Sequence, residues 1–218
     1  MLYFLVYNDN TQAQYIIKLL NSVKMYGKDF NIIIFNKSDI DTEFINNNKK
    51  ILDLKKCGIW KPYFIKNILN KINNDDILFY IDNQYHFIED FTNLFFDYMK
   101  SNDCLIFKYK PNGTVQYMKN YCKMDVIRKY KISDDVFNRN MELCWSGCII
   151  LKKNDNTIKY VTEWLNMCNY EDISDFPSKS KNESQFIEHS NEQSLLSIIV
   201  HKYDIPLQII ENKYLQNI

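Results

Sequence analysis

The sequence predicts an α/β fold in which a mostly parallel mixed sheet is flanked by helices. Two observations support this prediction. Residues 2–7, 12–26 and 31–35 form an apolar run, an amphipathic helical pattern and a second apolar run, which is the order of a β-α-β unit with a right-handed crossover. Further along, the apolar run Ile77–Ile81 has no polar interruption, as is typical of a strand buried on both faces of a parallel sheet.

Composition limits the classes of protein that the chain can belong to. With 218 residues it is long enough for one large domain, which we expect to span residues 1–218. Its 27 basic and 27 acidic residues balance, so bulk charge attracts it neither to nucleic acid nor to an anionic membrane. We therefore expect no nucleic-acid partner.

Cysteine and glycine usage excludes several kinds of site. The six cysteines show no CxxC spacing, which argues against a zinc knuckle or a redox pair and favours buried, reduced thiols. The apolar residues 2–7 are too few for a signal peptide or a transmembrane segment, so a cytoplasmic or similarly reducing compartment is expected. The four glycines form neither GxGxxG nor GxxxxGK[ST], so side chains would have to hold any bound nucleotide.

The remaining elements follow from apolar spacing and from residues that start or stop helices. Gly27 ends the first helix, and Pro62 can open a later one at its first turn. Further helices are predicted at residues 41–55, 89–99, 115–130, 156–167 and 191–203, and further strands at 104–109, 144–151 and 207–210. Residues 172–184 are predicted to be an irregular loop.

Asp82 directly follows the apolar run Ile77–Ile81 and is the first candidate functional residue. Ligands of open, mostly parallel sheets bind beyond the carboxyl ends of the strands, which is where Asp82 is expected. The alternative is that Asp82 only caps the next turn.

Three stretches together resemble a group of GT-A-type glycosyltransferases. Residues 58–63 read GIWKPY, residues 76–82 read DILFYID and residues 186–194 read FIEHSNEQS, and the group has WKPY, DILxYxD and EHRxDQSxxS in the same order. The resemblance implies a Rossmann-type mixed sheet. It also implies transfer of a sugar from a UDP-, GDP- or dTDP-linked donor to a hydroxyl of a glycan or a protein.

The resemblance also assigns roles to residues of the predicted metal and diphosphate site. Asp82 corresponds to the first acid of a DxD-type motif, which faces the donor diphosphate through a divalent metal, Mn or Mg. Here the motif reads Asp82-Asn83-Gln84, so it holds one carboxylate, and Gln84 is expected to be a weaker ligand. His189 would complete the metal shell, unless it caps the next helix or pairs with Glu188.

Other matches concern the sugar and the acceptor. Lys61 would contact the diphosphate or the sugar, although a solvated loop lysine is the alternative. Glu192 and Gln193 take the place of the family's Asp-Gln pair as the catalytic residues that bind the reacting hydroxyls, although Glu192 could simply stabilise a helix N-terminus. Ser190 replaces the family's arginine.

The last candidates come from strand ends and a strand interior. Ser146 and Gly147 interrupt the apolar residues 144–151 and look exposed, so they are expected to line the acceptor side of the site, with an ordinary strand bulge as the alternative. Asn8 and Asp9 follow the first strand and are placed by topology alone near the base or the ribose.

Two other classes of function remain open. A binding module for sugars or nucleotides that kept the fold and lost catalysis is favoured by the single carboxylate at Asp82 and by the departures at Ser190 and Glu192. A structural interaction protein whose motifs match by chance is the third possibility.

Overall fold

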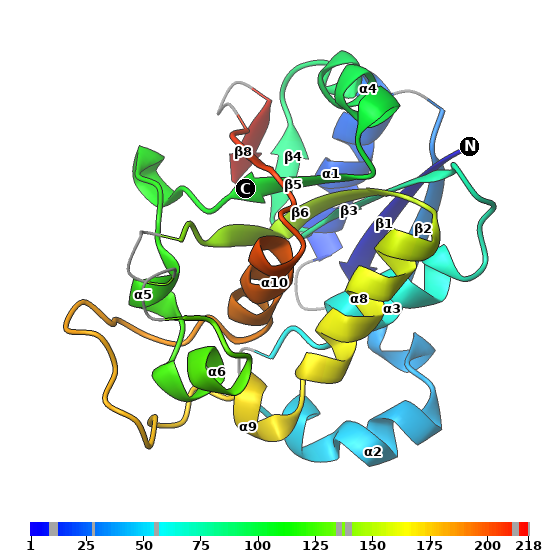
Figure 1. Ribbon diagram of the computed structural model, residues 1–218. Coiled ribbons are helices and arrows are strands. Elements are labelled where there is room, and N and C mark those ends of the chain that lie inside the picture. Colours follow the sequence, from blue (N-terminus) through cyan, green and yellow to red (C-terminus); the bar gives the residue numbers. More distant parts are fainter. Residues whose placement is uncertain are drawn as a thin grey trace.

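A mixed sheet forms the centre of the computed structural model, which describes residues 1–8, 13–27, 29–54, 57–133, 137, 141–210 and 214–217. Within these residues the strands have the order β2-β1-β3-β6-β5-β7 (Figure 1). Their bounds are β1 Leu2–Asn8, β2 Asn31–Asn36, β3 Ile77–Ile81, β5 Cys104–Lys108, β6 Cys144–Lys152 and β7 Leu207–Gln208. Strands β2, β1 and β3 are parallel, β7 is parallel to β5, and β6 is antiparallel to both β3 and β5. The predicted α/β class and mixed sheet are confirmed.

Helices pack on both faces of this sheet. They are α1 Ala13–Tyr26, α2 Thr42–Leu52, α3 Trp60–Leu69, α4 Thr92–Ser101, α5 Met118–Tyr121, α6 Met124–Lys129, α8 Asp155–Met167, α9 Tyr170–Ile173 and α10 Asn191–Lys202, with 3-10 turns η1 Lys37–Asp39 and η2 Pro111–Gly113. Several starts have a clear local cause. The Asp41 carboxylate caps α2 by accepting from the Phe44 N–H at 2.7 Å, and Asn154 caps α8 in the same way through Thr157 at 2.9 Å.

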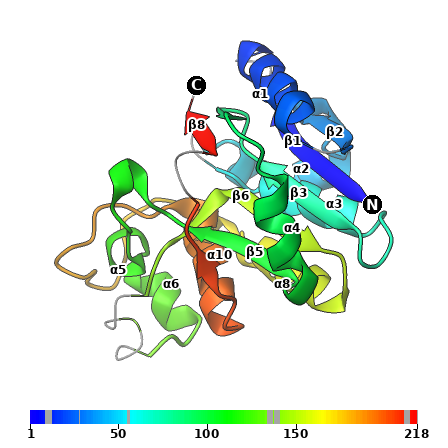
Figure 2. The ribbon, with the colours of Figure 1, turned by 90° about the horizontal axis from the view of Figure 1, so that it is seen from above.

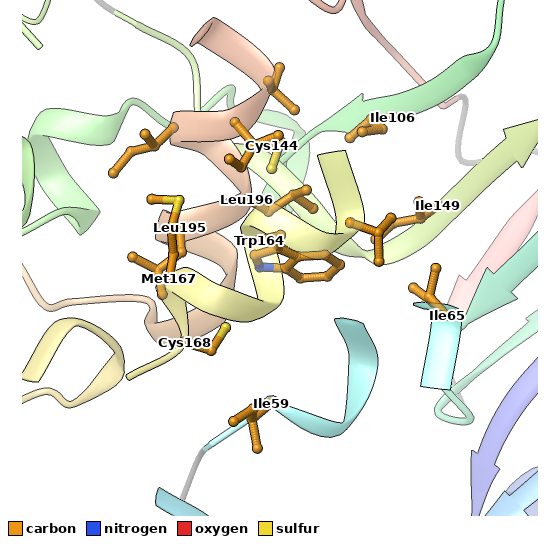
Figure 3. Packing of buried hydrophobic residues seen from close by; sticks show 14 of the residues in the cluster. Ile59, Ile65, Ile106, Cys144, Ile149, Trp164, Met167, Cys168, Leu195 and Leu196 are labelled. Carbon is orange, nitrogen blue, oxygen red and sulfur yellow. The ribbon is translucent and has the colours of Figure 1, made fainter. Parts of the chain in front are cut away.

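The two faces of the sheet bury different cores. On one face, α3, α8 and α10 enclose the fully buried Trp164, with Ile65, Ile149 and Leu196 around it (Figure 3). On the other face, α1 and α4 cover an aromatic cluster that contains Phe79. Figure 2 shows these two helices from above. Strand β3 contributes to both clusters, which confirms that it is buried on both faces.

The first core also fixes the start of α10. The Trp164 indole Nε1 donates a hydrogen bond to the Glu192 carbonyl at 2.8 Å. Trp164 therefore lies on the inner side of α8 and joins this helix to the first turn of α10. Because a buried indole N–H needs a partner, the bond makes the position of Glu192 depend on the core.

Some element predictions were wrong in detail. Residues 115–130 form two short helices instead of one, because the backbone is extended at Cys122 and Lys123. The helix predicted at 89–99 begins at Thr92, whose N–H and hydroxyl both donate to the Asp90 carboxylate. The loop predicted at 172–184 overlaps the end of the short helix α9.

A second, small sheet was not predicted. Strands β4 Tyr85–Phe87 and β8 Leu215–Asn217 pair in antiparallel fashion, which places the end of the described chain beside the segment that follows Asp82 (Figure 1). All six cysteines are buried and free, as predicted. Among the described residues no helix combines the length and the apolar character needed to cross a membrane.

Candidate active site

The side chain of Lys61 lies at the centre of a buried polar cluster. Lys61 is the second residue of α3 and is 8% exposed. Its Nζ lies 3.1 Å from Asp82 Oδ2, 3.1 Å from Glu192 Oε1 and 3.3 Å from Ser146 Oγ. These four residues come from α3, the end of β3, β6 and α10, so one cation joins four separate elements.

Asp82 is fixed from two directions. The Tyr80 hydroxyl donates to Asp82 Oδ1 at 2.7 Å, because residues two apart in a strand share a face. The Asp82 N–H donates to the Gly147 carbonyl at 2.9 Å, which continues the β3–β6 pairing beyond the strand. The Asp82 side chain keeps 24% of its surface exposed, so the carboxylate is oriented by the protein and still accessible.

Glu192 and Gln193 reach the same cluster from the first turn of α10. The Ser146 hydroxyl lies 3.2 Å from Glu192 Oε1 and 3.3 Å from Gln193 Oε1, and the Ser146 N–H also donates to Gln193 Oε1 at 3.3 Å. Because that N–H can only donate, the Gln193 carbonyl oxygen faces Ser146 and its amide NH2 group points elsewhere. Gln193 therefore offers donors to a ligand.

The carboxylates of this cluster keep Lys61 charged and Tyr80 protonated. Burial alone lowers the pKa of Lys61, but the Asp82 and Glu192 carboxylates outweigh burial and raise it above the ordinary lysine value. Burial, followed by the Asp82 carboxylate, raises the pKa of Tyr80 well above its ordinary value. At neutral pH Lys61 is therefore a cation, and Tyr80 stays protonated and donates to Asp82.

Two cavities meet at this cluster. The first, which we call the central cleft, has a volume of about 250 Å³ and is lined by Ser146, Gly147, Glu192 and Gln193, among other residues. The second, the strand-end cavity, has a volume of about 500 Å³ and is lined by Tyr7, Lys37, Trp60 and Tyr80, among others. Both cavities are also lined by Lys61, Asp82 and Gln84. The predicted residues Lys61, Asp82, Gln84, Ser146, Gly147, Glu192 and Gln193 are thus brought together.

The strand-end cavity also contains Tyr7 and Lys37, for which the sequence predicts no role. The rings of Tyr7 and Trp60 are stacked with centroids 5.2 Å apart, and Lys37 comes from η1. Asn8, for which contact with base or ribose was predicted, donates to the Asn36 side chain at 3.1 Å and so joins the ends of β1 and β2. Its predicted role stays a prediction, and Asp9 lies outside the described residues.

Tyr80 and Gly58 are further residues of the site without a predicted role. A Cβ atom at Gly58 would lie 2.2–2.5 Å from the Glu192 carboxylate atoms, so the glycine gives this carboxylate its space. The alternation of side chains along β3 could have identified Tyr80 as a neighbour of Asp82. No local pattern indicates the role of Gly58, because its neighbour comes from α10.

Ser146 and Gly147 differ from the expectation that they are exposed. Ser146 is 2% exposed. A Cβ atom at Gly147 would lie 2.4–2.9 Å from the Trp145 indole, so the close approach that glycine permits here is made by that ring. Both residues still line the central cleft.

Gly147→Ala is therefore expected to displace the Trp145 ring and to destabilise the protein by about 1–3 kcal/mol, the usual cost of overpacking. Urea denaturation and tryptophan fluorescence measure the two effects. In a Trp145→Leu background the same substitution should cost much less. An equal cost in both backgrounds would show that the indole is not the obstacle.

His189 has protein partners on both ring nitrogens. Nε2 lies 2.7 Å from the Asp172 carbonyl, and Nδ1 accepts from the Lys123 N–H at 3.4 Å. Burial, followed by the nearby Lys123 charge, lowers the pKa of His189 to about 4. These contacts explain a neutral, structural histidine, and the metal-ligand role stays a prediction that they do not favour.

The lowered pKa of His189 predicts a loss of stability in acid. Below the ordinary histidine pKa, His189 is protonated in the unfolded chain, whereas in the folded chain it stays neutral until the pH falls to about 4. The free energy of unfolding should therefore fall by about 2 kcal/mol from pH 7 to pH 5 through this residue. Urea denaturation of His189→Gln at both pH values should show a smaller fall, with His201→Gln as control. Identical falls in the wild type and in His189→Gln would contradict this.

The donor set fits a divalent metal only in part. Within the described residues no group of three or more His, Cys, Asp or Glu side chains could hold a metal ion. Asp82 supplies one accessible carboxylate, and Gln84 an amide beside it. Such a set suits a cation that keeps water and takes most other ligands from substrate phosphates, as Mg²⁺ commonly does.

Comparison with known proteins identifies the fold. No protein-family model and no curated protein matches the sequence. Mouse xyloside xylosyltransferase 1 matches with a TM-score of 0.52 and 7% identity over 97% of this chain and 86% of that chain. A glycosyltransferase involved in glycosylation of the major capsid of PBCV-1 matches with a TM-score of 0.50 and 12% identity, over 96% of this chain and 79% of that chain.

The WbbM bifunctional glycosyltransferase gives a TM-score of 0.54 at 10% identity, over 91% of this chain and 37% of that one. The chain thus has the fold of GT-A-like glycosyltransferases. At these identities the likeness concerns the fold.

Proposed function

We propose that this protein transfers a sugar from a nucleotide-diphosphate donor to a hydroxyl of a glycan or protein acceptor. The observation that carries the proposal is the Lys61 cluster. It joins Asp82, Ser146 and Glu192 at the boundary between two cavities. A donor that spans both cavities would have its diphosphate beside the cluster.

The strand-end cavity suits the nucleoside part of the donor. Its stacked Tyr7 and Trp60 rings provide an apolar, aromatic surface, and Lys37 and Lys61 provide positive charge. Lys61 and Asp82 would then face the diphosphate. UDP-, GDP- and dTDP-sugars all meet this description, and the titrations described below distinguish among them.

A divalent cation, Mn or Mg, would enter together with the diphosphate. Lys61 carries one positive charge against the two carboxylates of Asp82 and Glu192, so a bound diphosphate adds negative charge to a cluster that is already negative. When bound, the cation would neutralise the leaving diphosphate. Asp82 and Gln84 are the residues that would hold it.

The central cleft suits the sugar and the acceptor hydroxyl. In the reaction the bond from the anomeric carbon to the diphosphate oxygen breaks, the acceptor oxygen bonds to that carbon, and the proton of the acceptor hydroxyl passes to the Glu192 carboxylate or to the leaving diphosphate. Glu192 would accept hydrogen bonds from the reacting hydroxyls, and the Gln193 NH2 group would donate to the sugar. Ser146 keeps both side chains in place, which is the preorganisation that transfer requires.

Titration with UDP-, GDP- and dTDP-sugars, each with and without Mn²⁺, tests the proposal. Calorimetry should detect binding of at least one nucleotide sugar. The metal should bind more tightly when the nucleotide is present. Turnover should release nucleoside diphosphate, which can be measured directly. No binding and no turnover across the panel would contradict the proposal.

The second candidate is a binding module that no longer catalyses transfer. The single carboxylate of Asp82-Asn83-Gln84 favours it, because stronger sites of this type hold two acids. The same titrations separate the candidates. Binding without release of nucleoside diphosphate, in the presence of a broad set of glycan acceptors, would favour the binding module.

A further inference from the structure

A third cavity lies beside the central cleft, on the side of the small β4–β8 sheet. It has a volume of about 410 Å³ and is lined by residues that include Leu215 and Asn217 of β8. We call it the β8 groove. Gln84, Tyr85, Tyr109 and Trp145 line both the β8 groove and the central cleft. The groove therefore adjoins the space in which transfer is proposed to take place.

Aromatic side chains form the boundary that the two spaces share. Tyr85 and Trp145 meet edge to face, with ring centroids 4.9 Å apart and an angle of 77° between the rings. Tyr109 lines both spaces as well and is partly buried. Aromatic rings with polar atoms at their rims combine apolar contact with hydrogen bonding, as a sugar ring requires.

The β8 groove differs from the central cleft in charge. Lys108 and Lys110 line the groove, and no carboxylate is among its described lining residues. The central cleft has the opposite balance of charge, because its described lining residues include one lysine, Lys61, and four acidic residues: Asp82, Asp175, Glu188 and Glu192. Lys108 pairs with Glu142 at 2.8 Å, whereas Lys110 is exposed at the groove. Electrostatic complementarity thus favours a negative ligand group in the groove and not in the cleft.

We propose that the β8 groove binds an anionic part of the acceptor glycan, with its carboxylate or phosphate at Lys110 and its sugar ring against Trp145 and Tyr85. The inference rests on the proposed function, because it takes the central cleft as the place of transfer. It narrows the acceptor to acidic saccharides that extend at least one sugar beyond the reacting hydroxyl. An acceptor of this kind has a neutral end in the acidic cleft and its charge in the groove.

Binding of four defined probes to the full chain tests this inference. The first probe is a disaccharide with a glucuronic acid unit, and the second has glucose in place of that unit. The third is the glucose disaccharide phosphorylated at the 6-position of that glucose, and the fourth is inorganic phosphate. At low salt the two acidic disaccharides should bind about fivefold more tightly than the neutral one, the scale of one exposed charge pair. Added salt should remove this preference.

Lys110→Gln should abolish the preference, and Lys24→Gln, which removes an exposed lysine of α1, should not. Equal binding of acidic and neutral disaccharides, an unchanged preference in Lys110→Gln, or inorganic phosphate binding as well as the disaccharides would each overturn the inference. The two arms with carboxylate and phosphate identify which anion is preferred.

Donor titration of the same variants keeps this result separate from the proposed function. Nucleotide-sugar binding that survives in Lys110→Gln, together with a lost preference for acidic disaccharides, supports both. If the wild type binds a nucleotide sugar but shows no preference for acidic over neutral disaccharides, only the inference about the β8 groove is overturned. Failure of every nucleotide sugar, with the acidic preference intact, overturns the proposed transfer and keeps the groove as a saccharide site.

Discussion

Lys61→Met is expected to destabilise the protein by about 3–5 kcal/mol at pH 7, the usual cost of leaving a buried charge without its partner. Lys61 Nζ lies 3.1 Å from both Asp82 Oδ2 and Glu192 Oε1. Methionine fills much of the same volume without the charge, so two neighbouring carboxylates would repel each other with no cation between them. Nucleotide-sugar binding should be lost as well, because Lys61 lines both cavities.

The pH dependence of this effect follows from the raised pKa of Lys61. A lysine whose pKa is higher in the folded state contributes stability that is complete below the ordinary lysine pKa. This contribution is lost only as pH rises through the raised value. The difference between the wild type and Lys61→Met should therefore stay constant between about pH 7 and pH 9. A difference that vanishes in this range would contradict a charged Lys61.

Urea denaturation of a small set of variants measures the effect. Lys66→Met, in the same helix and less buried, is the matched control and should cost less than about 1 kcal/mol. In a Glu192→Gln background the cost of Lys61→Met should fall clearly, because one of the two carboxylates is then neutral. Equal costs in the two backgrounds would show that Lys61 and Glu192 are not coupled.

The sequence was sufficient for elements whose pattern is local. The run Ile77–Ile81 is buried as predicted, and the parallel pairing of β2 with β1 follows from the β-α-β order. The inward position of Trp164 follows from helical spacing. The three motifs also led to Lys61, Asp82 and Glu192, and the fold brings both carboxylates into contact with the Lys61 ammonium group.

Features that depend on distant partners could not be predicted. Strand β4 is short, and its partner β8 lies more than a hundred residues later, so neither has a local signal that separates it from a loop. Gly58 has no local signal either, because the Glu192 carboxylate that fills the space beside it comes from α10. The bonds of His189 depend on Asp172 and Lys123, which its own sequence neighbourhood does not reveal.

Asp82→Asn should lower kcat/KM for the preferred donor by about a hundredfold or more, equivalent to at least about 2.7 kcal/mol of transition-state stabilisation. The substitution keeps the shape of the side chain and leaves an oxygen to accept from the Tyr80 hydroxyl. Glu192 remains as a partner for Lys61, so the fold should be retained, which separates this variant from Lys61→Met. What is lost is the accessible carboxylate that would hold the divalent cation beside the diphosphate. Asp103→Asn removes an acid that pairs with Lys152 at the start of β5 and should leave kcat/KM unchanged. If Asp82→Asn keeps both kcat/KM and metal-dependent nucleotide affinity, Asp82 takes no part in the reaction, and its role is reduced to holding Lys61 and Tyr80 at the end of β3.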